Sequence, residues 1–303
     1  MSLTSIFNQK TRKDKEITLF IRSHLPKASD FHTVSGNRPF SAKDYIYHVE
    51  NNLSTPHESS QLGTAFDYLF SLDIANQPKQ PFDLNQVVAL KGHQMLKVKL
   101  PSSLFYDMHF MSSKTRMESH MHNTSVTTNY HRNATKIYGA CFLFAQLDLV
   151  FRSKILPEKI NKEWLFLPKG TFIDEFEQLQ ALAQEQVISK LSPQDTITFN
   201  PNFGLGSLLV RGADADADIV INDTLIDVKT TKNPGYRWKD IAQLVGYYFL
   251  NHINAKYGTT ESLNFSKVAL YKARFGELET INLDEFYGDN IDQITEGLYE
   301  RIK

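Results

Sequence analysis

The last third of the chain alternates between short apolar runs and polar breaks, a pattern typical of β-strands joined by turns. Two consecutive runs, 218–222 and 225–230, are rich in isoleucine, leucine and valine and are separated only by the polar pair Asp223-Thr224. Pro201 and Gly204 mark a further turn upstream. We therefore predict strands at 196–199, 207–211, 218–222, 225–230 and 266–272.

Longer segments carry apolar residues three and four positions apart, which is the period of an amphipathic α-helix. One such segment begins near Ser59 or Ser60, either of which is a suitable N-cap, and its apolar stripe runs from Leu62 to Phe70. Further helices are predicted at 133–152, 174–190, 238–255 and 284–301.

Two stretches between the predicted helices are less regular. Residues 96–100 alternate apolar and basic side chains, which predicts a half-buried strand, with the end of a helix as the alternative. Residues 111–132 are polar and contain several histidines, His120 among them. Because no carboxylate or cysteine stands at a matching spacing, we interpret this stretch as a polar loop and not as a metal site.

Together these elements predict an α/β fold with a central mixed sheet flanked by helices. The chain has 303 residues, of which 41% are hydrophobic and 22% charged, an ordinary composition for a globular protein and long enough for one large domain. No internal repeat or low-complexity linker divides it. We expect a single domain, 1–303, with a helical insertion at about 75–195.

Charge and cysteine content narrow the possible functions. The formal net charge is −1, so a nucleic-acid binder of this composition would need local basic patches. The one cysteine, Cys141, lies in an apolar run, which excludes an intramolecular disulfide and predicts a buried thiol. The first sixteen residues are polar and charged, and no apolar run approaches the length of a membrane helix, so we expect a cytoplasmic protein.

Three chemical signals follow one another in a fixed order across the predicted strands and the next helix. Asp218 opens one strand, the next contains Asp227-Val228-Lys229, and the helix contains Gln243 and Tyr247. Side chains alternate along a strand, so Asp227 and Lys229 should share a face, and Gln243 and Tyr247, four residues apart, should share a helix face.

These residue types suit metal-dependent hydrolysis of a phosphodiester. Such a reaction needs a cation on the phosphate oxygens, a deprotonated water and stabilisation of the developing charge. Mg²⁺ prefers oxygen ligands, and Asp218, Asp227 and the main-chain carbonyl of Val228 could supply them. Lys229 would then orient the water or stabilise the phosphorane, while Gln243 and Tyr247 would hold the lysine or the phosphate.

Each signal alone has an ordinary explanation. Asp-x-Lys is common on solvated strand faces, and Gln-x-x-x-Tyr is usually a packing pattern, so the prediction depends on their joint order. Asp214, Asp216 and Asp218 also suggest a calcium loop, but Ile219 and Leu225 occupy the positions that an EF-hand gives to glycine and glutamate.

At this point the sequence resembles the PD-(D/E)XK nuclease superfamily, and within it the RecB-like branch. The branch has an aspartate after a glycine-containing strand start, an acid-x-Lys strand and a Gln-x-x-x-Tyr helix. The matching residues are Gly212 with Asp218, Asp227-Val228-Lys229, and Gln243 to Tyr247. The resemblance covers residues 196–255 well and 59–72 weakly.

What the resemblance implies is a restriction-endonuclease-like αβββαβ core and cleavage of DNA with one or two Mg²⁺ or Mn²⁺ ions. It further implies a role in DNA repair, recombination, phage biology or defence. It leaves open whether the enzyme is an exonuclease or an endonuclease. A helical insertion is common in RecB-like proteins.

Two departures from the branch pattern leave alternatives open. The branch also has an upstream Gly-x-x-x-His helix whose histidine binds metal, and the match in this chain is Gly63 with Asp67 in place of histidine. Carboxylate also suits Mg²⁺ or Mn²⁺, so Asp67 is either a metal ligand or a surface acid. Gly212 stands six residues before Asp218 instead of three, which makes Asp216 the alternative to Asp218 as a metal ligand.

Cations and an aromatic residue follow the Asp-x-Lys strand. Lys232, Arg237, Trp238 and Lys239 are candidates for contacts with phosphates and unstacked bases, and a solvated loop with one buried tryptophan is the alternative. A non-catalytic nucleic-acid-binding or assembly module that retains the nuclease fold is the second functional hypothesis, and RNA as the substrate is a third.

Overall fold

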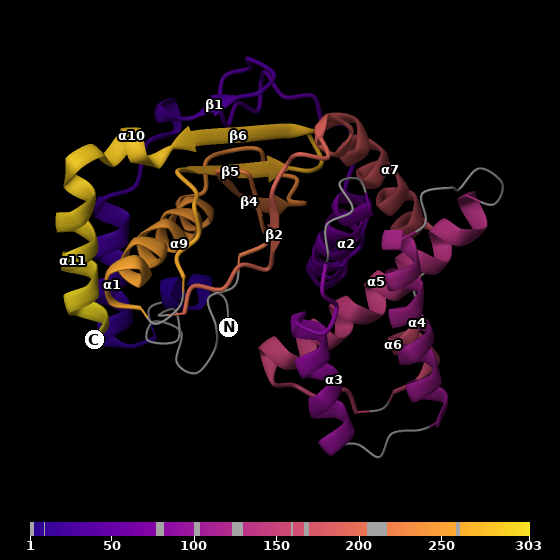
Figure 1. Ribbon diagram of the computed structural model, residues 1–303. Coiled ribbons are helices and arrows are strands. Elements are labelled where there is room, and N and C mark those ends of the chain that lie inside the picture. The colour runs from indigo at the N-terminus through magenta and orange to yellow at the C-terminus, as the bar shows by residue number, and fades with distance from the viewer. Residues whose placement is uncertain are drawn as a thin grey trace.

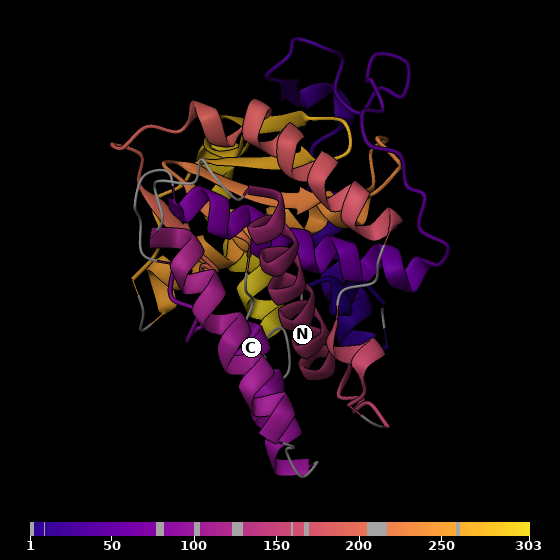
Figure 2. The ribbon, with the colours of Figure 1, turned by 90° about the vertical axis from the view of Figure 1, so that its right-hand side faces the viewer.

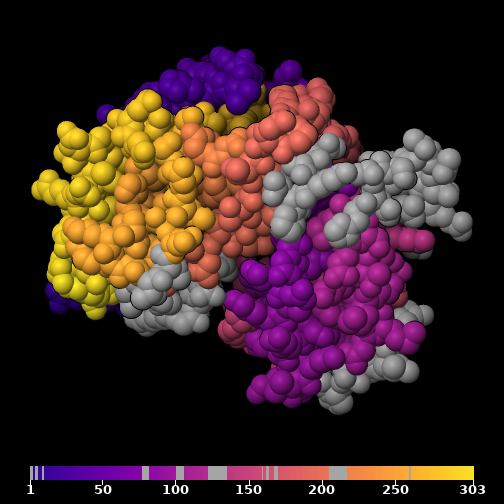
Figure 3. Space-filling model, viewed as in Figure 1, coloured from indigo at the N-terminus to yellow at the C-terminus, as the bar shows by residue number. Residues whose placement is uncertain are grey.

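The computed structural model describes residues 3–8, 10–76, 82–99, 104–122, 130–158, 160–166, 170–204, 217–258 and 261–303. Figure 1 shows an α/β region, which contains the sheet and both chain ends, beside a region made only of helices. In Figure 3 the helices α3 to α5 project away from the sheet region at the lower right. The predicted strand 207–211 lies outside the described residues.

The described part of the sheet has six strands in the order β1-β6-β5-β4-β3-β2. The β4–β5 pair is parallel and the other pairs are antiparallel, so the sheet is mixed, as the sequence predicted. The strands are β1 (His32–Thr33), β2 (Ile197–Phe199), β3 (Ile219–Ile221), β4 (Thr224–Lys229), β5 (Lys267–Lys272) and β6 (Glu277–Asn282).

Helices flank this sheet. The α/β region contains α1 (Arg12–Ser23), α9 (Trp238–Tyr257), α10 (Leu283–Tyr287) and α11 (Ile291–Ile302). The helical region contains α2 (Pro56–Asn76), α3 (Val88–Lys99), α4 (Leu104–His122), α5 (Tyr130–Ser153), α6 (Lys162–Leu165) and α7 (Thr171–Gln186). Figure 2 shows α7 running across the end of the sheet, with the other helices of this region beneath it.

β3 and β4 form a hairpin whose turn is Asn222–Asp223, one residue earlier than the predicted break. Asn222 has a φ of 53°, a conformation that asparagine tolerates better than most side chains. The hairpin pairs Ile221 with Thr224 and Ile219 with Ile226. This register brings the end of β4, with Asp227, beside the residue that precedes β3, which is Asp218.

Each face of the sheet has its own apolar core. Ile226 and Val228 of β4 point to the face covered by α2 and the helices after it. Val220 of β3 and Leu225 of β4 point to the face covered by α9, α1 and α11. Because strand side chains alternate, Asp227 and Lys229 lie on the α9 face together with Leu225.

Several predictions of secondary structure were wrong. Residues 96–99 are not a strand, since α3 extends to Lys99 and Val98 is exposed on the helix surface; residue 100 lies outside the described residues. The polar stretch at 111–132 is largely helical, because α4 and the start of α5 occupy its described residues. The predicted closing helix is divided into α10 and α11, and β1 and β6 had no clear sequence signal.

A buried ion pair joins the helical region to the sheet. Arg274, which follows β5, is fully buried, and its Nη2 lies 2.6 Å from Oε2 of Glu175 on α7. The same guanidinium donates to the main-chain carbonyls of Thr230 (2.6 Å) and Glu50 (2.9 Å). The chain after β4 is therefore held by the same side chain that anchors α7.

We expect Arg274→Met to lower the free energy of unfolding by about 3–5 kcal/mol, because it leaves the Glu175 carboxylate buried without its cation. Chemical denaturation followed by circular dichroism measures this. Arg274→Met/Glu175→Gln removes both charges and should recover part of the loss. A double variant that is less stable than Arg274→Met would contradict the assigned pairing.

Candidate active site

Asp218, Asp227 and Lys229 converge at the carboxyl end of β4. Lys229 Nζ lies 2.6 Å from Asp227 Oδ2, which confirms that the two side chains share a face. The Asp227 side chain is 3% exposed and that of Lys229 is 23% exposed, so solvent reaches the pair from the lysine side. Asp218, half-buried, completes the group from the neighbouring chain segment.

Asp218 is fixed by the main chain of β4. Its Oδ2 accepts a hydrogen bond of 2.9 Å from the N–H of Val228. The β3–β4 ladder ends at Ile219 and Ile226, so the Asp218 side chain takes the place of a main-chain partner beyond that point. The N–H and C=O of one strand residue point to the same side, and the Val228 carbonyl therefore faces the same edge as Asp218.

Carboxylates outnumber cations in this group, and this excess of negative charge raises the pKa values of Asp227 and Lys229. Burial raises the pKa of Asp227 to about 7; the charge on Lys229 opposes the rise, and the charge on Asp218 adds to it. Burial alone would lower the pKa of Lys229, but Asp227, Asp218 and Asp240 outweigh burial, and the pKa of Lys229 is raised. Lys229 therefore stays an ammonium group, which suits charge stabilisation and not proton abstraction.

Asp67 reaches this group from α2. Burial raises the pKa of Asp67 well above its usual range, with a further contribution from Asp218, while Lys229 opposes the shift. Gly63 lies one helical turn earlier on the same face and touches the chain just beyond β4: a Cβ at Gly63 would lie 2.8 Å from Thr230 Oγ1. The absence of a side chain at Gly63 lets α2 approach the end of β4 closely, on the helix face that also carries Asp67.

We expect Gly63→Val to lower the free energy of unfolding by about 1–3 kcal/mol, because the new side chain collides with Thr230 and forces the helix away. Gly139→Val on α5 is the matched control, since a Cβ at Gly139 would have no atom within 4 Å outside its own helix. Thermal and chemical denaturation of both variants gives the comparison. Equal losses would show that the close approach of α2 is not the role of Gly63.

Gln243 and Tyr247 share a face of α9, as predicted, and Gln243 Nε2 donates to the Tyr247 hydroxyl at 3.2 Å. The Tyr247 ring is fully buried and stacks on Phe203, with ring centroids 5.2 Å apart. A side chain so enclosed makes no direct contact with a substrate in this arrangement. Its hydroxyl instead holds the amide of Gln243.

Sequence reasoning missed two charged residues of this site. Asp240 lies in the first turn of α9, is 7% exposed and raises the pKa of both Asp227 and Lys229. Lys272 is fully buried and stands opposite Lys229 in the parallel β4–β5 register. For Asp240, the spacing to Gln243 on one helix was the available clue. The position of Lys272 beside Lys229 follows only from the strand register.

The predicted nucleic-acid contacts surround the start of α9. Arg237 is exposed, and its Nε lies 3.8 Å from Asp240 Oδ2. The ring of Trp238 is half-buried between Phe7, Arg22 and Lys239, with Arg22 Cζ 5.0 Å and Lys239 Nζ 5.8 Å from its centroid. Lys232 is exposed on the preceding loop. Cations and an aromatic ring thus lie beside the acidic group.

The other residues that the sequence analysis discussed lie in the helical region or outside the described residues. His120 Nε2 lies 2.7 Å from Asp73 Oδ1 on α2, inside the helical region. Cys141 is buried, as predicted, and burial raises its pKa. Asp216 and Gly212 lie outside the described residues, so the choice between Asp216 and Asp218 as a ligand stays a prediction.

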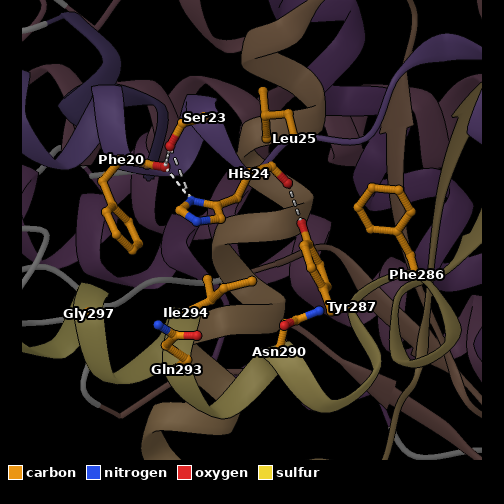
Figure 4. A pocket seen from close by; sticks show the side chains of 10 residues that line it. All are labelled: Phe20, Ser23, His24, Leu25, Phe286, Tyr287, Asn290, Gln293, Ile294 and Gly297. Carbon is orange, nitrogen blue, oxygen red and sulfur yellow. Dashed lines mark hydrogen bonds between the residues drawn. The ribbon is translucent and has the colours of Figure 1, made fainter.

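A cavity of about 660 Å³ lies between α1 and the C-terminal helices (Figure 4). His24 lines it, with Nδ1 at 2.8 Å from the carbonyl of Phe20, and the Tyr287 hydroxyl donates to the His24 carbonyl at 2.7 Å. Aromatic rings, amides and this histidine line the cavity, without a carboxylate or lysine side chain. None of the residues that the sequence singled out lines it.

The oxygen atoms of this group are of the chemical kind that Mg²⁺ and Mn²⁺ bind. Within the described ranges, no group of three or more histidine, cysteine or acidic side chains is placed so that it could hold a metal ion. Mg²⁺ does not need such a group, because it keeps several waters and binds through one or two carboxylates. Asp218 and Asp227, with the Val228 carbonyl at the same edge, are oxygen donors of this kind, whereas the role of Asp67 as a further ligand stays a prediction.

Comparisons with known proteins found no match: no family model, no curated protein and no solved structure is significantly similar to this chain. Among the described helices, none has the length and apolar content required to cross a bilayer.

Proposed function

We propose that this protein is a cytoplasmic Mg²⁺- or Mn²⁺-dependent nuclease of the RecB-like PD-(D/E)XK type that hydrolyses DNA. The observation that carries the proposal is the convergence of Asp218, Asp227 and Lys229, with the ammonium group 2.6 Å from a carboxylate that is almost fully buried. Repulsion between enclosed carboxylates destabilises a fold, so their presence here suggests a function, and perturbed pKa values cluster at functional sites.

The arrangement of elements supports the same proposal. α2, the strands β2, β3 and β4, then α9 and β5 follow one another along the chain, with helices α3 to α7 between α2 and β2. This order supports the αβββαβ core that the resemblance implies. α2 carries Asp67 on one face of the sheet, and α9 carries Gln243 on the other.

Each residue of the group has its own role in the proposed phosphodiester hydrolysis. A divalent ion bound by Asp218, Asp227 and the Val228 carbonyl would offset charge on the phosphate oxygens and acidify a water. Lys229, held as an ammonium group, orients that water or stabilises the phosphorane. Tyr247 fixes Gln243, whose amide positions the lysine or the phosphate.

The DNA backbone would approach over the start of α9. Arg237 and Lys239 offer cations there, Lys232 lies on the adjoining loop, and Trp238 offers a partly exposed ring. A protein with a net charge of −1 binds a polyanion through such a local patch, and its affinity falls as the salt concentration rises.

A gel assay tests the proposal directly. Purified protein is incubated with linear, circular and single-stranded DNA, with Mn²⁺, with Mg²⁺ and with EDTA. We expect cleavage with either metal and none with EDTA, and the comparison of circular with linear DNA separates endonucleolytic from exonucleolytic action. An RNA substrate in the same assay tests the choice of nucleic acid.

Calorimetric titration separates the nuclease from a non-catalytic binding or assembly module. The nuclease should bind Mn²⁺, and Asp227→Asn should weaken that binding. DNA binding without Mn²⁺ binding and without cleavage would replace the nuclease proposal by the binding module.

A further inference from the structure

The ring of Trp238 contacts two cations that come from different helices. Arg22 of α1 places Cζ 5.0 Å from the ring centroid, and Lys239 of α9 places Nζ 5.8 Å from it. Phe7, from the short helix η1 (Leu3–Asn8), meets the same ring edge to face, with the centroids 5.7 Å apart. The indole thus gathers an arginine and a lysine in one small region, although their like charges repel each other.

No carboxylate of the described chain neutralises these two cations. Neither Arg22 nor Lys239 makes an ion pair within the part of the chain that the structure describes. The acids closest to them in sequence are engaged elsewhere: Asp240 lies beside Arg237 at 3.8 Å, and Glu16 is paired within α1 at 3.0 Å. Cations that are gathered without an internal counter-ion suit an anionic ligand.

α1 extends this positive region away from Trp238. Lys15 and Arg22 are two helical turns apart, so they share one face of α1 and are separated by about 10 Å along its axis. Both are exposed, and Leu19 between them is 53% exposed, so this face is open to solvent along its length. The buried side chains of α1, Ile17 among them, lie on the opposite side.

These cations lie on the edge of the sheet that carries the candidate active site. β4 and β5 are parallel and α9 connects them, so α9 begins at the edge where β4 ends. Lys229 is the last residue of β4, and Trp238 is the first residue of α9. α1 packs against α9, as Figure 1 shows, and the surface therefore continues from the acidic group over Trp238 to α1.

We propose that the face of α1 that carries Lys15 and Arg22 binds the phosphate backbone of DNA and extends the substrate surface beyond the start of α9. The identity of the polyanion rests on the proposed function, because this face is continuous with the candidate active site. Trp238 acts here by holding Arg22 and Lys239 in place. Contacts of this kind position the DNA backbone and do not read its sequence.

Binding of a fluorescently labelled DNA duplex, followed by anisotropy in EDTA over a range of salt concentrations, tests the proposal without cleavage. Lys15→Gln/Arg22→Gln removes two phosphate contacts, so the slope of log affinity against log salt should become shallower by about 2. At physiological salt the affinity should fall about 10- to 100-fold. In cleavage assays KM should rise by a similar factor with an unchanged kcat, because neither side chain touches the reacting atoms.

Lys256→Gln/Lys267→Gln is the matched control. It removes the same charge from the last turn of α9 and the start of β5, at the far edge of the sheet, where each lysine has a surface ion pair. Its DNA affinity and salt slope should match those of the wild type.

Equal weakening in the two double variants, or wild-type affinity in Lys15→Gln/Arg22→Gln, would overturn the role of α1. An RNA duplex that depends on Lys15 and Arg22 more strongly than DNA does would overturn DNA as the partner. A wild type that cuts no DNA but binds it through these two residues would overturn the proposed function and leave the binding surface established.

Discussion

Asp227→Asn is expected to reduce metal-dependent DNA cleavage by on the order of a thousandfold or more while the fold persists. A single charged group at a reaction centre commonly contributes 10²- to 10⁴-fold, and Asp227 serves both as a metal ligand and as the partner of Lys229. The amide keeps the volume of the carboxylate, so packing against α9 is preserved. Initial cleavage rates with Mn²⁺, together with the circular dichroism spectrum, measure the two effects.

Asp223→Asn is the control for this substitution. Asp223 stands at the other end of β4, is about half exposed and pairs with Lys267 Nζ at 2.9 Å. The same chemical change there should leave cleavage unaltered. Full activity in Asp227→Asn, or an equal loss in Asp223→Asn, would remove the assigned role of Asp227.

Lys229→Met is expected to lower the cleavage rate by about 10²- to 10³-fold, since it removes the ammonium group that stabilises the developing negative charge. The loss should also depend on pH. Lys229 holds the pKa of Asp227 down against burial, so its removal lets that pKa rise above about 7. At pH 7 more of Asp227 is then protonated and Mn²⁺ binds more weakly.

Raising the pH deprotonates Asp227 again, and the Mn²⁺ affinity of Lys229→Met should therefore recover between pH 7 and 9 while the cleavage rate stays low. Calorimetric titration at several pH values, beside rate measurements, separates the two contributions. Lys267→Met controls for the loss of a lysine. If the Mn²⁺ affinity of Lys229→Met does not change with pH relative to the wild type, Lys229 does not govern the charge on Asp227.

Separate contacts with the backbone hold the residues of the candidate site in place. Asp218 is tied to the main chain of β4, Asp67 depends on the contact between Gly63 and Thr230, and Arg274 fixes the carbonyl of Thr230 from the other side. A group of repelling carboxylates holds its geometry only if the backbone around it is over-determined. The Arg274–Glu175 pair and the close approach at Gly63 thus fix the backbone next to the acidic group.

Local sequence patterns predicted the parts of the fold that depend on neighbours in the chain. Apolar periodicity located α2, α5, α7 and α9, and the two apolar runs around Asn222 and Asp223 identified the hairpin of β3 and β4 to within one residue. Strand alternation correctly placed Asp227 and Lys229 on one face, and helical spacing did the same for Gln243 and Tyr247. The misassigned segment at 96–100 shows the limit, because five alternating residues do not distinguish a strand from a helix end.

The sequence by itself determined the order of acid, acid-x-Lys and Gln-x-x-x-Tyr, because these signals depend only on spacing within one strand or one helix. The tertiary structure alone decided that the charge of Asp218 acts on Asp67 of α2, that Asp240 acts electrostatically on Lys229, that Lys272 pairs with Lys229 in the strand register, and that Glu175 pairs with Arg274. Those neighbours come from elements up to 151 residues apart in the numbering (Asp67 and Asp218), and they depend on how α2 and α9 pack on opposite faces of one sheet. No local propensity encodes such distances, since they result from burying two apolar faces at once.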